Sequence, residues 1–258
     1  MSTVIYSSPI FGPVHSRRLG ISLGLNLMPS DGKICTFDCI YCECGRNAEH
    51  RPSLKRPSRE EVKRALESKL LEMKELGPEP NVLTFAGNGE PTAHPDFPGI
   101  VSDVLALRDK YFPKAEVSVL SNGTRIFDDS VFDALLRLDN NIQKLDTVNP
   151  EYIDLIDSPA GEYNVEKVIE RLCEFKGRVM IQTMFLTGTL DGRDMNNTTD
   201  FYVGPWIDAL KRIKPYKVFI YTVARETPVS TLAKASADVL DGIASRLRGL
   251  GFETVVSY

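Results

Sequence analysis

The sequence predicts an α/β fold, a parallel sheet with crossover helices in a single domain of 258 residues. Three observations predict this fold. Strand-like and helix-like stretches alternate six times along the chain, which is typical of βα units. The strand candidates are continuously apolar, as expected for strands buried on both faces. Short polar motifs directly follow several of these strands, at the edge where the carboxyl ends of parallel strands meet.

The elements follow one another in a regular order. A first strand is expected at about 21–27, and a helix at about 58–76 begins at a capping box formed by Ser58 and Glu61. The further strand and helix pairs are expected at 81–85 and 97–111, at 117–124 and 128–138, at 179–185 and 203–213, and at 218–225 and 232–250, while the strand at 142–146 is followed by two helical segments, at 150–156 and 165–176. A strand at 252–256 adds an edge. The domain therefore divides into an N-terminal extension at about 1–20, a core at 21–228, and a C-terminal helix and strand at 229–258.

Composition and charge exclude several classes of protein. The net charge of -4 is not that of a general nucleic-acid binder. No run is long and apolar enough to cross a membrane, and no secretory signal is present. Five cysteines, an odd number in a long chain, argue against a disulfide framework. We therefore expect a cytoplasmic protein with reduced thiols.

Three cysteines form the most informative motif. Cys35, Cys39 and Cys42 have the spacing C-x3-C-x2-C, so three thiolates can converge on one metal centre and leave one coordination position open. Structural zinc usually takes two separated pairs of ligands, and Cys44 is too close to Cys42 to complete a tetrahedral site comfortably. Soft thiolates suit an iron–sulfur cluster, which Tyr41 can shield from water. An iron–sulfur site is favoured, and structural zinc stays as an alternative.

A glycine-rich turn follows the strand at 81–85. Gly87 and Gly89 permit positive φ and a close approach of the backbone to a ligand, with Asn88 between them. Glu90 then offers an acceptor to an ammonium group. The motif therefore predicts a ligand site, and an ordinary strand-to-helix turn is the alternative.

Polar residues also end the next two strands. Ser121 and Asn122 close one strand, where they either face a ligand or only form the turn. Lys144 and Asp146 lie two residues apart, so a strand places them on one face. Buried charges need partners, which predicts a Lys144–Asp146 pair or contact with a polar ligand. An exposed strand end is the alternative.

The remaining candidates come from later strands and from basic stretches. Gln182 is embedded in an apolar strand, and Arg225 carries a planar fork suited to a carboxylate or phosphate. Arg17 and Arg18, in a Gly-Pro-containing run that we expect to be a fixed loop, suit the same groups. The basic stretch 46–64 is either a patch for an anionic substrate such as RNA or a solvated loop and helix start.

Together these motifs resemble the radical S-adenosylmethionine (SAM) superfamily. The resemblance implies that Cys35, Cys39 and Cys42 hold a [4Fe-4S] cluster, whose fourth iron binds SAM, and that the turn at 87–90 binds the amino group of SAM as the family's Gly-Gly-Glu motif does. It implies that Ser121, Asn122 and Gln182 lie at the SAM pocket. It also implies a partial (β/α)6 TIM-like barrel, a 5′-deoxyadenosyl radical that abstracts hydrogen from a substrate, and an external one-electron reductant of the flavodoxin or ferredoxin type.

The resemblance extends from about residue 11 to 228 and is strongest to a subgroup related to the tRNA wyosine synthases. The motifs that carry it are Gly-Pro-x-x-Ser-Arg-Arg-Leu-Gly, Gly-Asn-Gly-Glu-Pro-Thr, Lys-Leu-Asp and Tyr-Thr-Val-x-Arg-x-Thr-Pro. Wyosine synthases hold a second cluster on further N-terminal cysteines, and no cysteine precedes Cys35 here, while Cys44 and Cys173 are too few to build one. The alternatives are a wyosine-type tRNA-modifying enzyme, a non-enzymatic iron–sulfur electron-transfer or sensor protein, and, more weakly, a glycyl-radical activase. The substrate is not predicted.

Overall fold

The computed structural model describes residues 3–16 and 20–258, and its centre is one curled sheet of eight strands. The strands lie in the order β1-β2-β3-β4-β5-β6-β9-β11, and every neighbouring pair except β1 and β2 is parallel. Their bounds are β1 Ile10–Ser16, β2 Gly20–Leu25, β3 Val82–Phe85, β4 Glu116–Ser121, β5 Asn140–Lys144, β6 Met180–Met184, β9 Lys217–Tyr221 and β11 Thr254–Ser257. Six βα units in sequence order therefore form a half-barrel, which confirms the predicted fold class.

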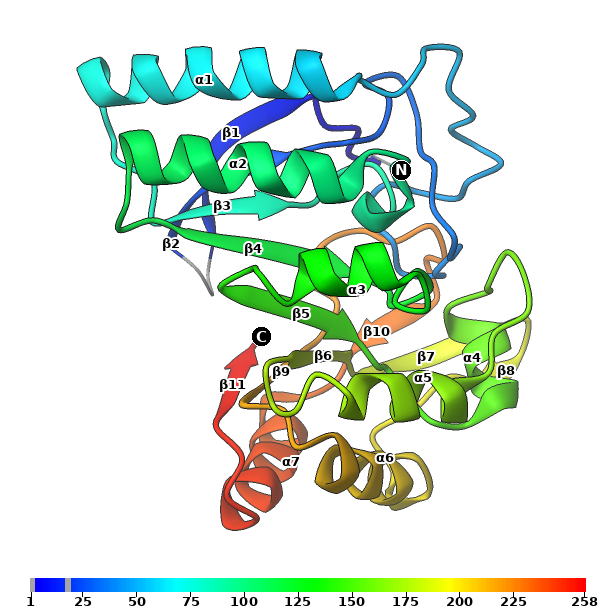
Figure 1. The fold of residues 1–258 in the computed structure, drawn as a ribbon. Coiled ribbons are helices and arrows are strands. Elements are labelled where there is room, and N and C mark those ends of the chain that lie inside the picture. Colours follow the sequence, from blue (N-terminus) through cyan, green and yellow to red (C-terminus); the bar gives the residue numbers. More distant parts are fainter. Residues whose placement is uncertain (1–2, 17–19) are drawn as a thin grey trace.

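Helices cover the outer face of the curled sheet (Figure 1). They are α1 Arg59–Leu76, α2 Phe97–Tyr111, α3 Asp129–Leu135, α4 Pro150–Ile156, α5 Val165–Cys173, α6 Asp200–Ile213 and α7 Ala237–Gly249, with a short 3-10 helix, η1, at Pro91–Ala93. The predicted capping box is present at the start of α1, where Ser58 and Glu61 bond to each other's backbone. In the part of the chain that the structure describes, no helix is long and apolar enough to span a membrane.

The N-terminal run expected to be a loop contains β1, which pairs antiparallel with β2 at the sheet edge. The register shifts between Phe11 and Val14, around Gly12 and Pro13. A bulge on an edge strand tolerates proline, because the missing N–H is not needed for the ladder. The glycine and proline that suggested a loop therefore mark an irregular strand. Arg17 and Arg18 lie outside the described residues.

Two boundaries near the C-terminus also differ from the prediction. The strand expected at 218–225 ends at Tyr221. The helix expected at 232–250 begins only at Ala237, after an N-cap at Ser236, because Leu232–Lys234 is a strand, β10. β10 pairs antiparallel with β7 (Leu186–Leu190), which also pairs with β8 (Arg193–Asp194), so a small second sheet stands after β6. A pairing partner distant in the sequence thus overrides the local helical pattern.

The hydrophobic core has two parts that matter for the site. The larger part lies between the sheet and its helices and includes Leu23, Phe85 and Trp206. The smaller part packs residues of the cysteine segment, such as Phe37 and Ile40, against α4 and β7. The cysteine segment therefore has a packed apolar floor of its own, which fixes it over the carboxyl ends of the strands.

Candidate active site

The segment that carries the three cysteines is bonded to the glycine-rich turn after β3. Ile34 N donates to Asn88 O at 3.0 Å, and Glu90 N donates to Ile34 O at 3.2 Å, which forms a short parallel bridge between Ile34 and Gly89. A Cβ on Gly89 would lie 1.8 Å from Ile34 O, and the φ of Gly89 is +137°. Glycine is required here because the two backbones touch. The two predicted motifs are thus one structural unit.

Asn88, which splits the two glycines, holds the N-terminal segment in place. Its Oδ1 accepts from Tyr6 N at 2.8 Å, and its Nδ2 donates to Tyr6 O at 2.8 Å and to Pro29 O at 2.9 Å. The Asn88 side chain is fully buried. Its side-chain donors and acceptor are therefore engaged with backbone, and its own backbone N–H and C=O bond to Asn26 Oδ1 and Ile34 N, so this predicted cofactor-binding residue acts as an anchor for the turn.

Glu90 and the end of β4 form the second side of the site. The Glu90 carboxylate is buried and accepts from Thr92 N at 3.0 Å and from Asn122 N at 2.7 Å. Burial raises the pKa of Glu90, and these hydrogen bonds oppose the rise. The Asn122 side chain donates to Thr36 Oγ1 at 2.9 Å and lies 3.7 Å from Cys35 Sγ. Ser121, through its Oγ, accepts from Gly123 N at 3.1 Å. The structure therefore brings three predicted motifs together around Cys35.

The thiols of the motif differ in their protonation. Hydrogen bonds from the Cys44 thiol and the Lys33 ammonium lower the pKa of Cys42 to about 6. Burial raises the pKa of Cys35 to about 12 and raises that of Cys39 as well. In the metal-free protein Cys42 is the thiolate at neutral pH, and the other two lose a proton when they bind a metal. None of the five cysteines forms a disulfide in this structure.

This donor set fits an iron–sulfur cluster better than a single zinc ion. Among residues 3–16 and 20–258, no three His, Cys, Asp or Glu side chains converge closely enough to hold one metal ion. A cubane takes one thiolate at each of several corner irons, so its ligands lie farther apart than those of zinc. The three thiols lie on one packed segment next to a glycine-lined turn, and their soft sulfur donors suit the irons of a cubane.

Lys33 was not predicted, and it lies within the cysteine segment. Its ammonium donates to Gly45 O at 2.7 Å, to Asp38 Oδ1 at 3.3 Å and to the Cys42 sulfur. Its side chain is 1% exposed. Burial lowers the pKa of Lys33, but nearby negative charge, that of Cys42 first, outweighs burial and raises the pKa overall. A lysine two residues before the first cysteine was the available sequence signal.

Lys144 and Asp146 form the predicted pair, with their charged atoms 2.7 Å apart. Asp157, which the sequence analysis missed, lies 3.3 Å from the same ammonium. The Tyr41 hydroxyl bonds to both Lys144 and Asp146, and the ammonium lies 4.5 Å from the centre of the Tyr41 ring. Tyr41 is 8% exposed. All of these groups lie on the Cys39 side of the segment.

Asp157 connects this network to a predicted cluster ligand. The Cys39 thiol donates to Asp157 Oδ1 at 3.3 Å, and burial raises the pKa of Asp157 to about 7. Backbone hydrogen bonds also join the cysteine segment to the end of α4. Asp38 N donates to Asp157 O at 2.8 Å, and Ile40 N donates to Ile156 O at 3.0 Å. The end of α4 thus supports the cysteine segment from the side opposite to Gly89.

The other predicted residues lie around this centre. Gln182 is buried in β6, in register with Lys144 of β5. Arg225 follows β9 and forms an ion pair with Glu43 at 2.5 Å, and it lies 3.4 Å from the Tyr6 hydroxyl. Arg225 therefore connects the loop after β9 to the cysteine segment. Cys173 ends α5 in the outer helix layer.

Comparison with known proteins agrees with this geometry. Residues 30–202 match the family model of the radical SAM superfamily. The chain is 31% identical over 223 residues to a protein of Brachyspira hyodysenteriae named GTPase Obg, and 29% identical over 220 residues to a UPF0026 protein of Methanocaldococcus jannaschii. These matches cover 84% and 83% of this chain, which spans 30% and 63% of the lengths of the two relatives.

Solved structures share the fold at low sequence identity. A radical SAM methyltransferase from Sphaerobacter thermophilus superposes with a TM-score of 0.68 at 16% identity, over 92% of this chain and 66% of that protein. An archaeal wyosine synthase, TYW1, superposes with a TM-score of 0.53 at 12% identity, over 88% of this chain and 71% of that protein. The family model and the shared fold confirm the predicted resemblance. The chain belongs to the radical SAM superfamily, a family of enzymes that use a [4Fe-4S] cluster and SAM.

Proposed function

We propose that Cys35, Cys39 and Cys42 hold the [4Fe-4S] cluster and that the chain cleaves SAM reductively to abstract hydrogen from an organic substrate. The observation that carries this proposal is the backbone bridge between Ile34 and Gly89, which joins the segment that carries the three cysteines to the Gly87–Glu90 turn. When bound, the cluster supplies one electron to the sulfonium of SAM, whose C–S bond then breaks to give a carbon radical. The residues around the cluster bind and orient SAM and exclude water from the site.

Each neighbouring residue has a specific role in this proposal. Gly87 and Gly89 leave room for the amino acid part of SAM, and Glu90 accepts from its ammonium group. Asn122 and Ser121 fix the edge of the pocket beside Cys35, with support from the 2.9 Å hydrogen bond of Asn122 to Thr36.

The Lys144–Asp146 pair and Gln182 form the opposite wall of the pocket, and Tyr41 excludes water from it. Buried polar groups with fixed partners provide such orientation without reorganisation during the reaction.

The electron donor and the substrate belong to the same proposal. We expect an external one-electron reductant of the flavodoxin or ferredoxin type in the cytoplasm. Arg17 and Arg18 stay predicted substrate contacts. Arg225 can meet a substrate carboxylate or phosphate only by exchanging its ion pair with Glu43, which is exposed enough for such exchange.

Anaerobic reconstitution with iron and sulfide, followed by dithionite and SAM, tests the proposal. We expect 5′-deoxyadenosine as a product, and we expect Cys42→Ala to lose both iron content and product. Cys173→Ala, which changes a thiol in the outer helix layer, is the matched control and keeps both. An intact cluster that is reduced but leaves SAM uncleaved would favour an electron-transfer or sensor protein instead.

A further inference from the structure

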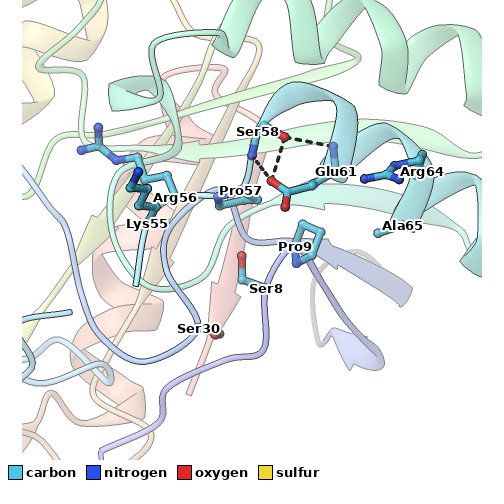
Figure 2. A pocket seen from close by; sticks show the side chains of 10 residues that line it. All are labelled: Ser8, Pro9, Ser30, Lys55, Arg56, Pro57, Ser58, Glu61, Arg64 and Ala65. Atoms are coloured by element: carbon cyan, nitrogen blue, oxygen red, sulfur yellow. Dashed lines mark hydrogen bonds between the residues drawn. The ribbon is translucent and has the colours of Figure 1, made fainter. Parts of the chain in front are cut away.

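A cavity of about 740 Å³ opens beside the first turns of α1, apart from the cysteine segment (Figure 2). Four stretches of chain meet there: the N-terminal segment before β1, the loop before the cysteines, the loop before α1, and α1 itself. The lining residues are Ser8, Pro9, Ser30, Lys55, Arg56, Pro57, Ser58, Glu61, Arg64 and Ala65. A site built from four segments is shaped by tertiary structure rather than by one local turn.

Positive charge is in excess in this cavity, although the whole chain carries a net charge of -4. Lys55 and Arg56 have no carboxylate within ion-pair distance among the described residues, and Arg64 only reaches Glu60 at 4.0 Å with both side chains exposed. The single lining carboxylate, Glu61, accepts from the Ser58 N–H and hydroxyl, each at 2.7 Å, as Figure 2 shows. The cationic groups are therefore available to a ligand.

Arg56 gives an independent sign of a missing partner. Its Nε is buried and has no hydrogen-bond partner in the part of the chain that the structure describes. Buried donors are nearly always paired, and the rest of the protein does not pair this one. Because Nε is covered by protein, a ligand in the cavity meets the two terminal nitrogens of the guanidinium, which are neither buried nor paired among the described residues. A guanidinium binds the oxygens of phosphate with particular geometric fit.

The other lining residues limit the class of ligand that the cavity can bind. Among the serines, the Ser30 hydroxyl can donate to anionic oxygens, whereas the hydroxyls of Ser8 and Ser58 already donate to Asn26 O and to the Glu61 carboxylate. No aromatic side chain is among the lining residues, so the cavity offers no surface on which a base or ring could stack. The volume exceeds that of one phosphate group. We propose that this cavity binds the phosphate groups of a phosphorylated ligand through Lys55, Arg56 and Arg64.

The cavity is connected to the SAM-binding turn through one short path. Pro57 O is 2.8 Å from His94 Nε2, and His94 closes the 3-10 helix that begins after Glu90. A ligand that orders the loop at 55–58 therefore contacts a segment next to the active site. The cavity nevertheless shares no residue with the proposed cluster and SAM sites, so this inference stands independently of the proposed function.

Calorimetric titration of the cluster-loaded full chain tests the proposal with three probes: inorganic pyrophosphate, ribose 5-phosphate and a short single-stranded RNA. We expect binding of at least one probe and a loss of at least about tenfold in affinity in Arg56→Met, since a charge-assisted hydrogen bond is removed. Lys74→Met removes an equal charge from the far end of α1 and is the matched control. Pyrophosphate or ribose 5-phosphate binding identifies a small phosphate ester, and binding of RNA alone identifies a phosphodiester chain.

A second variant keeps the proposal testable if Arg56→Met does not fold. Ser30→Glu adds a negative charge at an exposed lining position without removing a buried group, and it should weaken the same probe to a similar degree. The proposal is overturned if none of the probes binds, or if Arg56→Met and Ser30→Glu, both folded by circular dichroism, bind as tightly as Lys74→Met.

Discussion

Two buried lysines flank the cysteine segment, and their surroundings differ. Lys144 contacts two buried carboxylates, those of Asp146 at 2.7 Å and Asp157 at 3.3 Å. Lys33 contacts one carboxylate, Asp38 at 3.3 Å, whose side chain is 27% exposed, and otherwise a carbonyl and a thiol. The charge of Lys144 is therefore balanced within the protein. The charge of Lys33 is balanced mainly by Cys42, one of the proposed cluster ligands.

Because their surroundings differ, Lys144 and Lys33 have different tasks at one site. The Lys144 network contacts Cys39 and the end of β5 in the metal-free protein, so its contribution belongs to folding. Lys33 stabilises negative charge on the cysteine segment, which grows as thiols lose protons and bind the cluster. We therefore expect substitutions at Lys144 to change stability first, and substitutions at Lys33 to change the cluster first.

The largest expected effect is that of Lys144→Met on the metal-free protein. Removal of the ammonium leaves Asp146 and Asp157 buried without a cation, which typically costs about 3–5 kcal/mol of unfolding free energy. Urea denaturation measures this loss. Lys217→Met, which removes a partly exposed ion pair with Glu253, is the control and should cost less than about 1 kcal/mol. Equal losses in the two variants would contradict a self-balanced buried network.

The second-largest effect is on the pH dependence of the unfolding free energy, to which Asp157 contributes. Its pKa rises from 3.8 to about 7 on folding, so between these values the folded state binds more protons than the unfolded state. Stability from this group is complete below about pH 4 and falls as the pH rises to about 7, by at most about 1.4 kcal/mol per pH unit. Asp157→Asn should remove this part of the slope, measured as unfolding free energy against pH in metal-free protein. Identical slopes in both proteins would refute it.

The third prediction distinguishes Lys33 from Lys144 through the cluster itself. Lys33→Met should lower the reduction potential, because the reduced cluster is more negative and loses a nearby buried cation. A shift of about 60 mV corresponds to about 1.4 kcal/mol for one electron. Potentiometric titration followed by electron paramagnetic resonance measures it, with the exposed Lys74→Met as control. An unchanged potential would mean that Lys33 only holds the loop.

The sequence predicted much of this site because its signals are local. The spacing of Cys35, Cys39 and Cys42 and the glycines at 87 and 89 are visible in short stretches, and period two placed Lys144 beside Asp146. The regular alternation of strands and helices predicted the half-barrel, since each βα unit carries its own pattern.

Contacts between distant residues could not be predicted in this way. Asp157 reaches Cys39 only because α4 packs against the cysteine segment, and β10 becomes a strand only because β7 pairs with it. The position of Lys33 two residues before Cys35 was visible in the sequence, but its burial depends on how the loop folds around Gly45 O. The role of Asn88 as an anchor for Tyr6 likewise depends on the path of the N-terminal segment.

The smallest expected effect is that of Asp38→Asn, which changes the carboxylate partner of Lys33. Asn47 N donates to Asp38 Oδ1 at 2.8 Å, and Asp38→Asn keeps an oxygen that can accept this hydrogen bond. Lys33 also keeps its 2.7 Å hydrogen bond to Gly45 O. Because Asp38 is partly exposed, the metal-free protein should lose no more than about 1 kcal/mol. Asp146→Asn, in a side chain with 0% exposure, should cost more, since it removes charge from inside the buried network. Denaturation of the two variants side by side measures the difference, and a loss in Asp38→Asn as large as in Asp146→Asn would show that both lysines are held by folding alone.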